Sequence, residues 1–196
     1  MVAPDLAQAP ADFRTAVAGL SRARLRAGTD IAELPAPARL APWTHAIAVT
    51  VPDDEGEEAA SGRLVLLHDP AGVAAWDGTL RVVVFGTCEL DNEMAGDPLL
   101  AEVAWSWLTE LLASHGVAYT ALGGTVTCTC STRFGDIAGP PRTDELEVRA
   151  SWTATDTDTS GHLTAFAEFL ATAAGLPPEG VSPIRDSPHP FASRIS

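Results

Sequence analysis

The chain has 196 residues, enough for one domain with a substantial core, and 46% of them are hydrophobic. Its formal net charge at pH 7 is −14, and all 12 of its basic residues are Arg. Because binding to nucleic acid or to an anionic membrane requires a surplus of basic side chains, this charge argues against both as partners.

The sequence carries no signal that would direct it out of the cytoplasm. The N-terminal segment does not combine a charged start, an apolar stretch and a cleavage site, and no apolar run approaches the ~18 residues that cross a bilayer. Three cysteines, an odd number, favour reduced thiols over a disulfide framework. We therefore expect a cytoplasmic protein.

The first third of the chain predicts one helix and a connector. Residues 1–11 are rich in Ala and Pro and are expected to fray. From Asp12 to Ala27, apolar residues recur every three or four positions, which is typical of an amphipathic helix, and Gly28 stands where it would end. Residues 34–42 contain three prolines and are expected to be extended. Four arginines in the helix are interpreted as a solvated face: Arg14, Arg22, Arg24 and Arg26.

Three strand candidates follow in the middle of the chain. Alternating residues predict the first over 44–51, ahead of an acidic loop at 53–58. The second, 63–67, is apolar on both faces and is expected in the centre of a sheet. Turn sequences at 69–72 and 77–78 lead into the third, which runs from Thr79 to about Leu90.

The second half predicts two helices and two strands. Asp97-Pro98 is typical of a helix start, and this middle helix is expected to run to His115. Strands follow over 117–133, with a bulge or bend at Gly123-Gly124, and over 146–152. The last helix is expected over 161–174, before Gly175 and two prolines.

Together these elements predict an α+β fold with the order α-β-β-β-α-β-β-α. Short links between strands indicate a mainly antiparallel five-stranded sheet with three helices on one face. We expect a single domain over residues 12–176 and an extended Pro- and Ser-rich tail over 177–196.

Few residues suggest chemistry, and no strong catalytic or nucleotide-binding motif is present. Cys128 and Cys130 share a strand face, and Cys88 and His45 lie on other apolar faces, so a metal set is conceivable. Because Cys-x-Cys lacks the usual spacer, we interpret the cysteines as small core residues and predict no metal and no cofactor.

Two further polar groups are weaker still. Residues 156–161 resemble the start of a calcium loop, but position twelve is Ala167, so we expect a helix start capped by Thr159 or Ser160 instead. His68 and Asp69 are neighbours on a strand and point to opposite faces, so they are interpreted as turn-flanking residues. We assign no catalytic residue.

The middle helix carries a wider apolar arc than one sheet contact needs. Trp105 and Trp107 lie on opposite sides of this arc, so one sheet does not cover both. Either the C-terminal helix or tail covers the remaining stripe, or a second molecule does. For the second case, the residues proposed to mediate protein interaction are Trp105, Leu108 and Leu112.

Several segments resemble an actinobacterial family catalogued as domain of unknown function 3000. They are residues 66–72 (LLHDPAG), 76–79 (WDGT), 97–100 (DPLL), 105–110 (WSWLTE) and 173–177 (AAGLP). The resemblance covers about residues 12–178 and implies no particular activity. Separately, the element order is similar to that of type III secretion chaperones and YbjN-like proteins, which are small domains that dimerise and bind other proteins.

Two functions remain open on these observations. The first is a non-enzymatic, chaperone- or adaptor-like module that binds a protein partner or itself through the middle helix. The second is an enzyme or small-ligand-binding domain with a pocket against the sheet, drawing on His45, His68, Cys88, Cys128 or Cys130.

Overall fold

A computed structural model of the chain describes residues 6–37, 40–137, 139 and 142–178. Its core is one antiparallel six-stranded sheet with the strand order β1-β2-β3-β4-β6-β5. The strands are β1 (Asp30–Leu34), β2 (Trp43–Pro52), β3 (Glu58–Val73), β4 (Gly78–Leu90), β5 (Tyr119–Thr132) and β6 (Arg142–Ala154). The helices are α1 (Ala11–Leu20), the single turn α2 (Asn92–Ala95), α3 (Leu100–Ser114) and α4 (Ser160–Ala173). Two short 3₁₀ turns cover Leu6–Gln8 and Ala74–Trp76.

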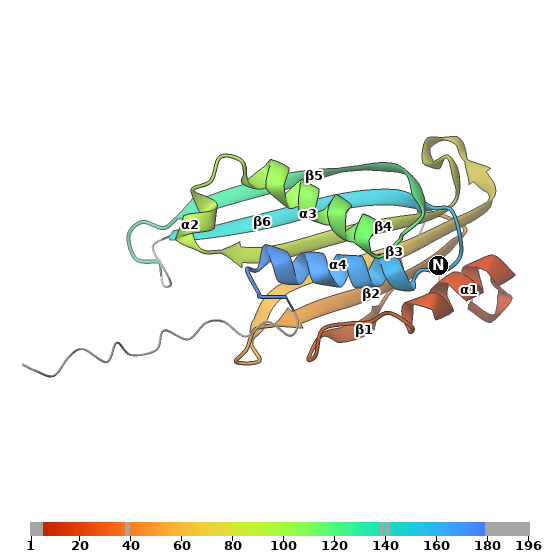
Figure 1. The fold of residues 1–196 in the computed structure, drawn as a ribbon, viewed down its shortest axis with the longest axis horizontal. Helices are drawn as coiled ribbons and strands as arrows, with labels where there is room; N and C mark the ends of the chain where they lie inside the picture. Colours follow the sequence, from red (N-terminus) through yellow and green to blue (C-terminus); the bar gives the residue numbers. More distant parts are fainter. Residues whose placement is uncertain (1–5, 38–39, 138, 140–141, 179–196) are drawn as a thin grey trace, which may run out of the picture.

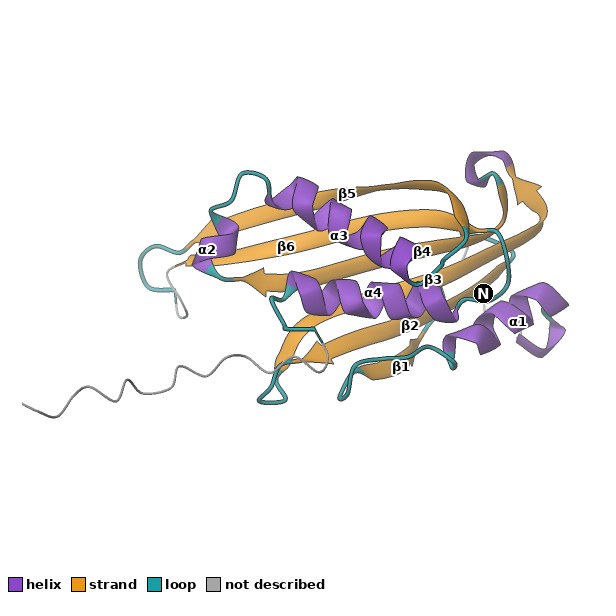
Figure 2. Cartoon of the chain, viewed as in Figure 1, coloured by secondary structure: helices purple, strands orange, loops and turns teal. Residues whose placement is uncertain are grey.

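The helices cover one face of the sheet, as Figures 1 and 2 show. Helix α4 lies over β2, β3 and β4, whereas α3 lies beside α4 and over β5. The predicted α+β class with a mainly antiparallel sheet is confirmed. The core lies between the sheet and α4, where Trp152, Phe166 and Phe169 are almost completely buried.

The sheet has one strand more than predicted, because β1 was not foreseen. Its five residues pair antiparallel with β2, from Asp30 opposite Thr50 to Leu34 opposite Ala46. A strand this short has little alternation of its own, and it is stabilised by the ladder to β2 and not by local sequence. The strand precedes the connector predicted at 34–42 and shares only Leu34 with it.

Helix α1 is shorter than predicted, since it ends at Leu20 and not near Ala27. The apolar spacing continues beyond Leu20, but Ala23 and Leu25 pack against the core from a non-helical segment. The backbone N–H of Arg24 donates to the Thr164 hydroxyl of α4 at 3.1 Å, which replaces a helical hydrogen bond. Tertiary packing has overridden the local helical pattern here.

Helices α3 and α4 and strands β2, β4 and β5 are found close to their expected bounds. Strands β3 and β6 are longer than predicted: β3 includes the turn expected at 69–72, and β6 extends beyond 146–152 at both ends. Helix α3 begins at Leu100, after the Asp97 carboxylate accepts the backbone N–H of Leu99 at 2.8 Å. The predicted irregularity near Gly123 is present as a register shift between Thr120 and Gly123. Residues 1–5 of the expected frayed segment and 179–196 of the expected tail lie outside the described residues.

The order of the strands along the sheet places β5 at an edge. After β4 the chain passes through α3 and then enters β5, which lies two positions from β4 in the sheet. Strand β6 then returns into the space between β4 and β5 and pairs with both. The two ends of the sheet are therefore β1 and β5.

Candidate functional site

The middle helix, α3, turns most of its apolar arc toward its own chain. Leu108 and Leu112 are fully buried, at 0% exposure, on the stripe that also contains Leu100 and Ala104. In this conformation their own chain encloses both leucines, and their predicted role at an interface stays a prediction. The stripe packs on α4 and the sheet because its four residues recur at helical spacing.

The two tryptophans of α3 lie on the flanks of that stripe. Trp105 packs over β5 at Gly124, where a side-chain carbon would lie only 2.8 Å from the indole ring. Both Trp105 and Trp107 are half-buried and pack against the main core. Cover from within the chain therefore accounts for most of the wide arc, and a protein contact through Trp105 stays a prediction.

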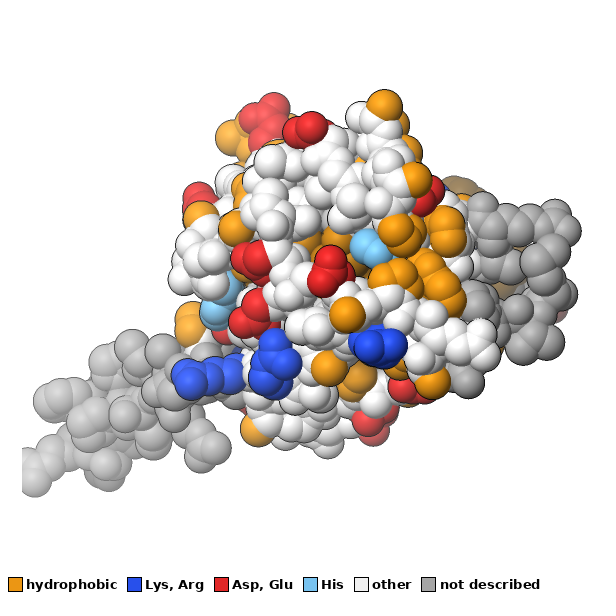
Figure 3. Space-filling view, turned by 90° about the vertical axis from the view of Figure 1, so that its right-hand side faces the viewer, with side chains coloured by type: hydrophobic (Ala, Val, Ile, Leu, Met, Phe, Trp, Pro, Cys, Tyr) orange, Lys and Arg blue, Asp and Glu red, His pale blue; other side chains and the backbone are white. Residues whose placement is uncertain are grey.

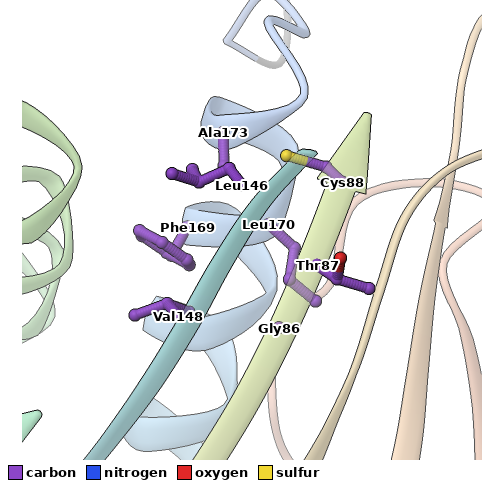
Figure 4. Close-up of a pocket in the computed structure, with 8 residues that line it drawn as sticks. All are labelled: Gly86, Thr87, Cys88, Leu146, Val148, Phe169, Leu170 and Ala173. Carbon is purple, nitrogen blue, oxygen red and sulfur yellow. The ribbon is translucent and has the colours of Figure 1, made fainter. Parts of the chain in front are cut away.

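The residues proposed to line a pocket against the sheet do not come together. His68 is 4% exposed, its Nδ1 lies 3.0 Å from the carbonyl oxygen of Thr79, and its ring stacks on Phe13. Cys88 is buried against α4, as Figure 4 shows, next to Leu146 and Ala173. Burial, with a smaller contribution from Glu145, raises the pKa of the Cys88 thiol to about 11. Such a thiol is protonated and unreactive at neutral pH.

Cys128 and Cys130 are exposed to solvent, unlike the buried Cys88. Both are exposed on β5, opposite Leu146 and Asp144 of β6. The interpretation of these two thiols as core residues is therefore wrong, because β5 extends beyond the cover of α3. Within the part of the chain that the structure describes, no group of three or more metal-binding side chains is found.

The segment at 156–161 forms the start of α4, although by different contacts from those predicted. The carboxylate of Asp158 accepts both the backbone N–H and the hydroxyl of Ser160, at 3.2 and 2.7 Å. The same carboxylate forms a salt bridge with the Arg22 guanidinium at 3.1 Å. The Thr159 hydroxyl is turned away and donates to the carbonyl of Ala16 in α1. These contacts join α1 to α4 and occupy the Asp158 carboxylate.

The arginines near α1 are used in part by the chain itself. Besides Arg22, Arg14 donates to the carbonyl of Ala9 at 2.9 Å and Arg26 to that of Pro177 at 2.6 Å. Figure 3 views the end of the molecule that carries α1, where the basic side chains gather in one band among acidic and apolar ones. These arginines therefore hold parts of the chain together, and the face they lie on carries both positive and negative side chains.

The most unusual surface of the molecule is the outer edge of β5. This strand is 14 residues long, and from Tyr119 to Thr132 it contains no charged side chain and no proline. Most of its residues are exposed, and among the described residues it forms a ladder with β6 alone. The opposite edge, β1, has only five residues and carries Asp30 and Glu33. Natural sheets protect their edges by shortness, charge, proline or bulges. Strand β1 is short and acidic, whereas β5 has a register shift between Thr120 and Gly123 and none of these protections over residues 123–132.

Large apolar side chains lie at the end of this edge. Phe134 is 80% exposed and Ile137 is 63% exposed; they lie two and five residues after Thr132, the last residue of β5. Side chains of this size are normally buried; here they follow β5 in the chain, with Arg133 and Asp136 as charged neighbours. We refer to β5 together with Phe134 and Ile137 as the β5 edge.

Acidic side chains follow the β5 edge on the sheet face that the helices leave uncovered. Glu147 lies opposite Thr127 and Glu145 opposite Thr129 in the register of β5 and β6. The Glu145 carboxylate accepts the hydroxyl of Thr87 at 2.8 Å, and Glu147 pairs with Arg149 at 2.7 Å. An uncharged strand thus runs beside two carboxylates, of which Glu147 is paired with Arg149.

Sequence reasoning found the strand but not the edge. The absence of charge over residues 119–132 is visible in the sequence, and so are the apolar residues after it. Their exposure depends on β6 being inserted between β4 and β5, which no local pattern indicates.

Comparison with known proteins gives a family and no activity. The chain matches the family described as "Protein of unknown function (DUF3000)" over residues 9–182. No curated protein and no solved structure shows a significant match. The likeness to secretion chaperones therefore still depends on element order alone. No helix in the described ranges has the length and apolar character needed to cross a membrane.

Proposed function

We propose that this chain, which belongs to the DUF3000 family, is a non-enzymatic protein-interaction module that binds an extended segment of another protein along the β5 edge. The partner segment would add a seventh strand to the sheet. Backbone hydrogen bonds would supply affinity, and alternate side chains of the segment would supply specificity. We place this module in the cytoplasm, as the sequence predicts.

The observation that carries the proposal is the contrast between the two sheet edges. Strand β1 is short and acidic, whereas β5 offers 14 residues without a charge or a proline. A long, flat, uncharged edge promotes unwanted pairing, and sequences under no other requirement avoid it. An edge that is used for binding has to remain open.

Phe134 and Ile137 supply the apolar anchor that strand addition alone lacks. Aromatic and large aliphatic side chains that become buried contribute most of the energy of a protein interface. Because Phe134 stands two residues after the end of β5, a segment that pairs with β5 and extends past Thr132 would come near it. The anchor and the ladder therefore belong to one surface.

The charge of the chain favours a basic or neutral segment. The net charge of −14 and the Glu145 carboxylate beside β5 repel acidic partners and attract Lys and Arg. For the same reason a second copy of this chain is the less suitable occupant, since pairing two β5 edges brings two acidic chains together.

A peptide display library screened against the full chain tests this proposal. We expect the selected peptides to alternate apolar residues and to carry Lys or Arg. The double variant Thr127→Lys/Thr129→Lys places two positive charges along the edge, next to Glu147 and Glu145, and should weaken binding of the selected peptides at least about tenfold. Phe134→Ser should weaken it independently.

Matched changes at the other edge provide the controls. Ala32→Lys places a charge on the exposed edge strand β1, and Leu40→Ser removes a side chain that is 58% exposed between β1 and β2. Both should leave peptide binding unchanged. Selected peptides that bind the β5 double variant as tightly as the native chain would contradict the proposal. A concentration-dependent dimer abolished by the same variant would instead identify a second copy as the occupant.

A further inference from the structure

A pocket of about 350 Å³ opens between α1, β1, β2 and the start of α4. Its wall is apolar, with Val17 and Leu20 from α1, Ile31 from β1, Ile47 from β2 and Leu163 from α4. Leu20, Ile47 and Leu163 are buried and belong to the main core, so the floor of the pocket is rigid. Because α1 ends at Leu20, the segment that follows it forms one side of the pocket through Ala23 and Leu25.

Two polar side chains converge on this pocket from neighbouring strands. Glu33 of β1 lies opposite Ile47 of β2, and His45 stands two residues before Ile47 on the same face. Within the described ranges, Glu33 forms no ion pair and the His45 ring forms no hydrogen bond. A pocket with an apolar body and a few convergent polar groups is the usual form of a small-molecule site.

The charges around the pocket define the kind of head group that fits. Glu33 supplies an exposed carboxylate, and none of the described residues that line the pocket is Lys or Arg, although Arg22 and Arg24 are next to lining residues in the chain. Burial lowers the pKa of His45, and the nearby Glu33 only partly opposes this effect, so the ring is neutral at pH 7. A neutral imidazole can accept a hydrogen bond from a cationic donor, and the pair therefore favours an ammonium group over a carboxylate or phosphate.

We infer that this pocket binds a small amphipathic cation, with its apolar part among Leu20, Ile47 and Leu163 and its ammonium group beside Glu33 and His45. The volume of about 350 Å³ is at the lower end of the range for ligand sites, which suits a compact apolar group. The inference is independent of the β5 edge, which lies at the other end of the sheet.

Three probes of the same length test the inference: hexylammonium, hexanol and hexanoate. Binding to the full chain is followed by NMR or by calorimetry at pH 7. We expect hexylammonium to bind most tightly, hexanol more weakly and hexanoate weakest. Glu33→Gln keeps the shape of the side chain and should weaken hexylammonium about fivefold while leaving hexanol unchanged.

A second variant fills the pocket without touching its polar groups. Ala23→Phe should abolish binding of both hexylammonium and hexanol, and circular dichroism checks that the variant remains folded. Equal affinity for hexylammonium and hexanoate would overturn the inference. So would an unchanged affinity of Glu33→Gln, or no binding of hexylammonium up to its solubility limit.

Discussion

Acidification should destabilise this protein mainly through one buried side chain, His162. The residue is 1% exposed at the start of α4, and its Nδ1 lies 2.7 Å from Nε1 of Trp152. The indole N–H can only donate a hydrogen bond, so Nδ1 of His162 must accept it and carry no proton. Protonation of Nδ1 would replace this hydrogen bond with two opposed donors inside the core.

The expected size of the effect follows from the pKa of this group. Burial lowers the pKa of His162 from 6.5 to about 4, although Asp156 and Asp158 act in the opposite direction. Between these two values the unfolded chain binds a proton and the native chain does not. The free energy of unfolding therefore falls as the pH drops from 6.5 to about 4, by about 3 kcal/mol in total.

Urea unfolding of the native chain and of His162→Gln across this pH range measures the effect. The amide oxygen of Gln can accept the Trp152 N–H and does not titrate, so the variant should be less stable at pH 7 but should lose less on acidification. The pKa of His45 is also lowered by burial, and it contributes equally to both proteins. An equal loss of stability in both proteins would refute the assignment to His162.

Three further changes probe the packing and the thiols. Leu108→Ala should lower the free energy of unfolding by about 2–5 kcal/mol, because the side chain is fully buried, and a urea midpoint near that of the native chain would contradict this. Gly124→Ala should cost about 1–3 kcal/mol, since the new Cβ would clash with the Arg149 carbonyl oxygen. Gly123→Ala meets no atom within 4 Å and serves as the control. A thiol reagent at pH 8 should modify Cys128 and Cys130 in the native chain and Cys88 only after unfolding, and mass spectrometry identifies the modified residues.

The sequence was sufficient for the elements whose stability is largely local. Helix α4 and strand β4 were predicted within a residue or two because their apolar residues repeat with a clear period. Strand β1 was missed because it is held in place by β2, and α1 was predicted too long because Ala23 and Leu25 reach the core without being helical. Both errors arise where tertiary contacts outweigh local preference.

The candidate sites show the same limit more sharply. The apolar arc of α3 indicated burial correctly but not its partner, and for Leu108 and Leu112 the partner is the chain itself. The uncharged run at 119–132 was readable, yet only the strand order shows that it forms an edge. His45 was singled out from the sequence, whereas Glu33, which shares its pocket, lies on the strand that was missed.

The most direct test of the protein-interaction function is an NMR titration of the full chain, labelled with ¹⁵N, with a peptide selected from the display library. We expect shift changes and slowed amide exchange along residues 119–132 and around Phe134, with β1 unaffected. Changes that cluster instead at Trp105 on α3, or along β1, with β5 unaltered, would contradict strand addition at the β5 edge.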